Sequence, residues 1–119
     1  MVELLNWAAA LTTIAFGAFG FLAPRYTLTA LDLVTTNTTM GLSEMRASVG
    51  GLFVALGVAA LIINAPWVYV AIGIAYTGAA IGRIVSLIFD APPTKKLFVF
   101  GGIEAGLALW LIAANASAF

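Results

Sequence analysis

Hydrophobic residues run along the chain in four long stretches, which short polar segments separate. The first stretch covers residues 4–23 and stops at Pro24-Arg25, where a proline and a charge mark a boundary. Three further stretches cover residues 43–63, 66–90 and 95–115. An α-helix needs roughly 20 apolar residues to cross the hydrocarbon core of a bilayer, and each stretch is about that long. The pattern therefore predicts an all-α membrane protein with four transmembrane helices.

The segments between the predicted helices differ in length. Residues 24–42 are polar and rich in threonine, and in this long loop we expect a short helical turn at the membrane interface. The other two connections, residues 64–65 and 90–94, contain or precede proline and are short. Short connections make neighbouring helices antiparallel, so we expect a four-helix antiparallel bundle. The whole chain, residues 1–119, is interpreted as one integral membrane domain.

The composition agrees with residence in a membrane. Hydrophobic residues make up 63% of the 119 residues and charged residues 8%, whereas a typical soluble domain has about 25% charged residues. The five basic and five acidic side chains cancel, so the chain lacks the basic field that attracts nucleic acid. It has no cysteine and no histidine, which excludes disulfides, thiolate metal sites and histidine-based catalysis. We therefore expect no cofactor, no metal site and no nucleic acid partner.

The positions of the basic residues predict the orientation in the membrane. Four of the five flank the first and third connections, and these are Arg25, Arg46, Lys95 and Lys96. Cytoplasmic loops of membrane proteins carry an excess of Lys and Arg, so this side is expected to be cytoplasmic. Both termini then lie on the non-cytoplasmic side, and we expect the protein in the bacterial inner membrane.

Two charged residues fall inside the predicted spans. Arg83 precedes Asp90 by seven residues, and Glu104 follows Lys96 by eight. At about 1.5 Å per residue, both therefore lie roughly 10–12 Å inside the cytoplasmic boundary. A lone charge near the bilayer centre costs about 2.5–3.5 kcal/mol, so a pair at matched depth is favoured. We predict an Arg83–Glu104 ion pair.

Other polar and small residues define two further sets of candidates. The candidate binding cluster comprises Glu44, Arg46, Tyr76, Arg83, Ser86, Asp90 and Glu104. At the membrane edge, Glu44 and Arg46 can equally form a solvated interfacial pair. Glycines let membrane helices approach closely, and the candidate packing positions are Gly17, Gly20, Gly50, Gly57 and Gly101. We assign no catalytic residue and no metal ligand.

Two motifs carry a resemblance to a known family. Residues 43–51 read SEMRASVGG, residues 82–92 read GRIVSLIFDAP, and the last predicted helix contains Glu104. The chain resembles a family of small bacterial four-helix membrane proteins that is known only as a domain of unknown function. Its pattern reads E-x-R-A-x-x-G-G, then G-R-x-x-S-x-x-x-D-G, then a glutamate in the last helix. This sequence departs from the pattern at Ala91, where glycine is usual, and at Ser43, where asparagine is common.

The resemblance covers essentially the whole chain and implies which positions the family keeps. These are Glu44, Arg46, Gly50, Gly51, Arg83, Ser86, Asp90 and Glu104. It implies no activity.

Three functions are compatible with the sequence. The first is a non-catalytic accessory or assembly subunit that packs against a larger membrane complex, with membrane lipids and an integral membrane protein or a second copy as partners. The second is a binding or transport module for a lipid or small amphiphile, in which Glu44, Arg46 and the Arg83–Glu104 pair line a cytoplasm-facing polar cavity. The third is an intramembrane enzyme in which Glu104 and either Asp90 or Glu44 act as acid and base on an apolar substrate. We favour the accessory subunit and expect no enzymatic activity.

Overall fold

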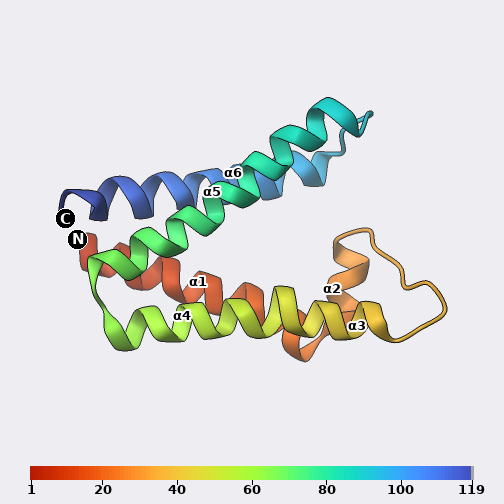
Figure 1. Cartoon of the computed structure of the whole chain (residues 1–119), viewed down its shortest axis with the longest axis horizontal. Coiled ribbons are helices and arrows are strands. Elements are labelled where there is room, and N and C mark those ends of the chain that lie inside the picture. The colour runs from red at the N-terminus through yellow and green to blue at the C-terminus, as the bar shows by residue number, and fades with distance from the viewer. Residues whose placement is uncertain (119) are drawn as a thin grey trace. The chain divides into compact units, whose positions relative to one another are not determined.

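The protein is helical along its length. A computed structural model describes residues 1–118, which contain helices and connections and no strand (Figure 1). Four helical segments are long and apolar enough to cross a membrane: α1 (Val2–Leu22), the continuous run Met40–Ile63, α5 (Pro66–Phe89) and α6 (Lys95–Asn115). The all-α class and the four candidate spans predicted from the sequence are thus confirmed.

The helices form two compact units, each of which contains two of the four spans. We call residues 3–63 the first hairpin and residues 64–118 the second hairpin. Each is described by itself.

In the first hairpin, α1 lies alongside a helical run of mixed geometry (Figure 1). The run consists of α3 (Met40–Glu44), the π-helix η1 (Met45–Gly51) and α4 (Leu52–Ile63). The Leu52 N–H donates to the carbonyl five residues earlier, which is the hydrogen bond that defines a π-helix. α1 and α4 run in opposite directions, so the first hairpin is antiparallel (Figure 1).

The long connection of the first hairpin contains the expected short helix. This helix, α2 (Pro24–Ala30), begins on the proline that ends the first apolar stretch. Proline suits the first helical turn because its missing N–H has no partner there in any case. The run with α3 begins at Met40, earlier than the predicted start at residue 43, and the Thr38 hydroxyl accepts a 3.3 Å hydrogen bond from the Met40 N–H. Thr38 thus provides an acceptor for the N–H of the first residue of α3.

Glycines hold α1 and its partner helix close together. A Cβ atom added at Gly17, Gly20, Gly50 or Gly57 would have its nearest backbone neighbour on the opposite segment 2.5 to 3.0 Å away. At Gly50 that neighbour is the Phe21 nitrogen, at 2.5 Å. Backbone atoms cannot yield as a flexible side chain can, so only glycine fits. At these four predicted packing positions, the glycine lies directly against the opposite segment of the first hairpin.

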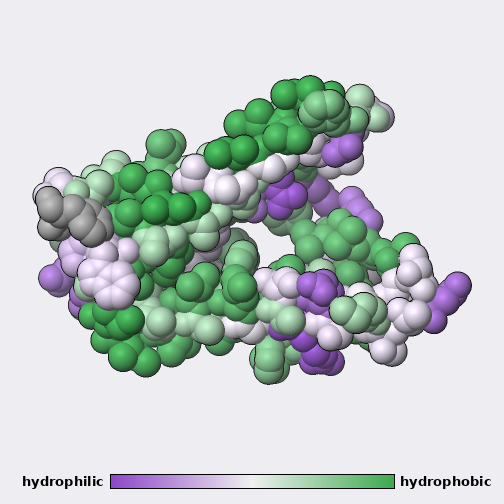
Figure 2. All heavy atoms as spheres, viewed as in Figure 1, coloured by the Kyte–Doolittle hydropathy of each residue, from purple (hydrophilic) through white to green (hydrophobic). Residues whose placement is uncertain are grey.

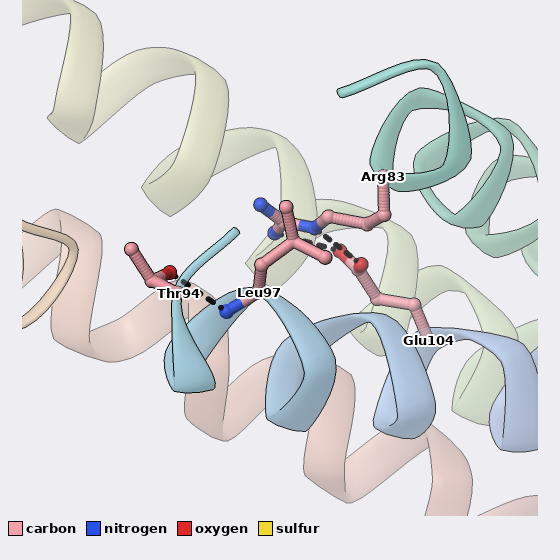
Figure 3. A network of polar contacts seen from close by, with 4 residues as sticks. All are labelled: Arg83, Thr94, Leu97 and Glu104. Atoms are coloured by element: carbon pink, nitrogen blue, oxygen red, sulfur yellow. Dashed lines mark hydrogen bonds and ion pairs between the residues drawn. The ribbon is translucent and has the colours of Figure 1, made fainter. Parts of the chain in front are cut away.

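In the second hairpin, α5 and α6 are antiparallel neighbours, followed by the short 3-10 helix η2 (Ala116–Ala118). Asn64 precedes α5 with a φ of 48°, a left-handed conformation that asparagine tolerates better than most residues. Its side-chain oxygen accepts a 2.8 Å hydrogen bond from the hydroxyl of the buried Tyr69. At the other end, the Thr94 hydroxyl caps α6 by accepting a 3.2 Å hydrogen bond from the Leu97 N–H (Figure 3).

The helices present apolar side chains outward. Over the helices the visible surface is mainly hydrophobic (Figure 2), and large residues such as Ile62, Ile88 and Leu109 are 69–78% exposed. A water-soluble protein rarely exposes contiguous apolar surface on this scale. The surface therefore fits apolar surroundings such as lipid chains or other membrane helices.

Candidate functional site

The predicted ion pair forms in the second hairpin. Arg83 on α5 and Glu104 on α6 point toward each other (Figure 3). The guanidinium Nε donates to Glu104 Oε1 at 2.8 Å and Nη2 donates to Oε2 at 3.2 Å, which is a bidentate arrangement. The pairing inferred from matched depth is confirmed. This geometry ties the two spans of the hairpin together at one level.

Two residues of α6, Phe100 and Gly101, lie directly against the Arg83 side chain. The Arg83 guanidinium lies 5.9 Å from the centroid of the Phe100 ring, within the range of a cation–π contact. A Cβ atom at Gly101 would lie 3.3 Å from Cγ of Arg83, so the glycine makes room for the arginine side chain. Gly101 thus serves the ion pair and differs in this respect from the glycines of the first hairpin.

The pair is only partly covered. The Arg83 side chain is 38% exposed and the Glu104 side chain 18% exposed. Of the remaining predicted residues of this hairpin, Tyr76 is buried, while the Ser86 hydroxyl donates to the Asp90 carboxylate at 3.0 Å. That bond lies on the exposed end of α5 and holds Asp90 locally. Ser86 and Asp90 therefore form a contact of their own, apart from the Arg83–Glu104 pair.

In the first hairpin, Glu44 and Arg46 have different partners. The Ser48 hydroxyl donates to Glu44 at 2.6 Å, and Nη1 of Arg46 donates to the Phe21 carbonyl at 2.6 Å. The interfacial pair that the sequence allowed is replaced by these two bonds. Phe21 lies in the last turn of α1, where carbonyls lack helical partners, so Arg46 caps the carboxyl end of that helix. Of the cluster predicted from the sequence, Glu44 and Arg46 belong to the first hairpin and the other members to the second.

Two adjoining hollows surround Arg46 in the first hairpin. The larger has a volume of about 580 Å³ and includes Phe21, Thr39 and Ser43 in its lining. The smaller, of about 400 Å³, shares Arg46 and is also lined by Arg25. The sequence identified Arg25 only as a marker of membrane orientation. Arg25 and Arg46 line the same hollow because of how the long connection folds, and no sequence motif predicts that fold.

The charged residues are not arranged as a metal centre. Among residues 1–118, no group of three or more aspartate, glutamate, histidine or cysteine side chains could hold a metal ion.

Comparisons with known proteins place the chain in a family. Comparison with curated proteins and with solved structures gave no match. Residues 1–115 match the family described as Domain of unknown function (DUF4345), which covers nearly the whole chain and includes the ion pair, the basic hollows and all four candidate spans. The chain is therefore a member of the DUF4345 family and a small four-span membrane protein.

Proposed function

We propose that the chain is a non-catalytic accessory subunit that packs against the helices of a larger complex in the bacterial inner membrane. In this proposal the four spans form an antiparallel bundle with both termini on the non-cytoplasmic side, as the distribution of basic residues favours. A contrast between the glycines of the two hairpins is the observation that carries the proposal.

The second hairpin has glycines that its own helices leave open. Apart from its chain neighbours and the backbone of its own helix, no heavy atom of residues 1–118 lies within 4 Å of a Cβ built at Gly78 or Gly82 on α5, or at Gly102 or Gly106 on α6. Within each helix the two glycines are four residues apart, which is the G-x-x-x-G spacing that lets membrane helices approach closely. In the first hairpin, by contrast, Gly17, Gly20, Gly50 and Gly57 already contact the opposite segment. The open faces of α5 and α6 are therefore suited to helices from outside this hairpin.

The partial exposure of the ion pair supports the same proposal. An arginine side chain that is 38% exposed at membrane depth still presents polar surface, which lipid chains solvate poorly. A protein neighbour that covers α5 and α6 would remove this surface from the lipid. An accessory role therefore accounts for both the open glycines and the incompletely covered pair.

The test is to extract the protein in mild detergent from its native membrane and identify co-purifying proteins by mass spectrometry. We expect a stoichiometric integral membrane partner. Gly82→Leu should remove it, because leucine fills the open face. Ile81→Leu, at the neighbouring exposed position of α5, is the matched control and should retain the partner.

Two outcomes would contradict the proposal. If the protein migrates alone and no stoichiometric partner appears, the accessory role is wrong. If the only partner is a second copy of the chain, the open faces pack as argued but the protein is a homo-oligomer and not a subunit of a larger complex.

A further inference from the structure

The hollows around Arg46 combine positive charge with apolar surface near the end of a candidate span. Their lining contains two arginines, Arg25 and Arg46, and neither an aspartate nor a glutamate. They lie where α1 ends and α2 begins, which is the level of the lipid headgroups if α1 crosses the membrane. The second hairpin differs, because there Arg83 is paired with the Glu104 carboxylate.

Arg46 is held in place and keeps donors to spare. Its bond to the Phe21 carbonyl uses Nη1, and this bond holds the guanidinium of a residue that lines both hollows. An arginine has five N–H donors in a planar fork, so Nε and Nη2 remain available on one edge. This edge can donate two parallel hydrogen bonds to a phosphate. The anchored arginine is therefore already oriented for an anion.

Arg25 adds a second positive charge that has no partner within residues 1–118. Its backbone carbonyl accepts from the Thr29 hydroxyl, but its guanidinium makes no hydrogen bond or ion pair among those residues. The side chain is exposed and lines the smaller hollow together with Arg46. On the other side, the larger hollow includes the hydroxyl-bearing residues Thr39 and Ser43. Two cations and two hydroxyls thus line adjoining spaces.

The rim of the hollows is apolar and aromatic. Leu22 and Tyr26 line the smaller hollow and are 73% and 66% exposed. Tyrosine is favoured at the level of lipid headgroups, and exposed leucine suits acyl chains. Arg46 itself belongs to the π-helix η1, and π-helical turns occur frequently at functional sites. These features match a ligand with an anionic head and an apolar tail.

We propose that Arg25 and Arg46 together bind the phosphate ester group of an anionic ligand, supplied by a phospholipid headgroup. This inference goes beyond the accessory role and does not depend on it, because it concerns the first hairpin alone. The chemistry that the site recognises is the phosphate ester, which a soluble phosphate ester also carries, so the experiment includes both sources.

The experiment measures the affinity of the full chain for phosphatidylglycerol in nanodiscs of phosphatidylcholine, with native mass spectrometry to count bound lipids. Arg25→Gln is the decisive variant, because it removes a charge without breaking a contact of the fold. We expect it to lower the affinity at least tenfold. Lys95→Gln is the matched control, an exposed cation of the other hairpin on the same expected side of the membrane. It should lower the affinity by no more than about fivefold, the general loss for one surface cation near an anionic membrane.

A second variant tests the arginine fork. Arg46→Lys keeps the positive charge but loses the planar pair of donors, so we expect an intermediate loss of affinity. Circular dichroism checks that the helix content of this variant is unchanged. Competition by glycerol 3-phosphate would show that the site accepts a soluble phosphate ester, and absence of competition would show that it needs the lipid. Both results support recognition of the phosphate group.

Two results would overturn the proposal. General attraction of cations to an anionic membrane predicts roughly a fivefold loss for any surface arginine or lysine. Equal losses for Arg25→Gln and Lys95→Gln would therefore mean that no specific site exists. Binding of phosphatidylglycerol no tighter than that of phosphatidylcholine would lead to the same conclusion.

Discussion

A double-mutant cycle on Arg83 and Glu104 tests whether their ion pair stabilises the second hairpin. The variants are Arg83→Gln, Glu104→Gln and the combination of both. Removing one member leaves the other charge inside the membrane without its partner, while removing both leaves two neutral amides. The cycle therefore separates the energy of the pair from the energy of each side chain.

The expected magnitudes follow from the geometry. Arg83→Gln leaves Glu104, which is 18% exposed and short, so the loss should approach about 3 kcal/mol, the cost of a lone embedded charge. Glu104→Gln leaves Arg83, which is 38% exposed and can extend toward water, so about 2 kcal/mol is expected, typical of a hydrogen bond to a charged group. The double variant should lose about 1 kcal/mol, because it still lacks the cation–π contact with Phe100.

The assay is unfolding by sodium dodecyl sulphate in mixed micelles, followed by far-ultraviolet circular dichroism and tryptophan fluorescence. The free energy of unfolding of each variant gives the coupling. Ser86→Ala is a suitable control, because its bond to Asp90 lies on the exposed end of α5, and it should stay within about 0.5 kcal/mol of the parent protein. Additive losses in the double variant would refute the reasoning, since they would mean that the two charges do not stabilise each other.

Two further predictions concern the rest of the molecule. Gly50→Ala should destabilise the first hairpin by about 1–3 kcal/mol in the same unfolding assay, because its Cβ would lie 2.5 Å from the Phe21 nitrogen. Gly102→Ala is the control and should not destabilise the second hairpin, because the Cβ position at Gly102 is open. Because the chain has no cysteine, Asn37→Cys and Ala65→Cys report orientation directly. An impermeant thiol reagent applied to intact cells should label the Ala65→Cys variant and not the Asn37→Cys variant. Labelling of Asn37→Cys alone would show that the proposed orientation is inverted.

Much of the fold could be predicted from the sequence, because long apolar stretches have few alternatives in a membrane. The Arg83–Glu104 pair was predictable for a related reason, since two opposite charges at the same membrane depth avoid the cost of a lone embedded charge by pairing. The bond from Arg46 to the Phe21 carbonyl was not. Its acceptor is a backbone atom 25 residues away, and backbone acceptors are the same at every residue. The sequence also did not predict that Gly50 packs against α1 while Gly82 lies open, because it shows where a glycine is but not which helix the glycine contacts.

The π-helix of the first hairpin has a consequence for how relatives of this chain can be compared. A π-turn holds one residue more than an α-turn, so deleting a single residue within Met45–Gly51 would restore an α-helix there. The part of the helix before the deletion would then rotate by about 100° relative to α4. Arg46 would leave the Phe21 carbonyl and the two hollows, while α4 kept its packing on α1. Relatives that lack one residue between Arg46 and Gly50 would keep the glycine that packs against α1 but would lose the two hollows around Arg46. The length of this segment, rather than the presence of an arginine, is therefore the feature by which to judge whether a relative retains them.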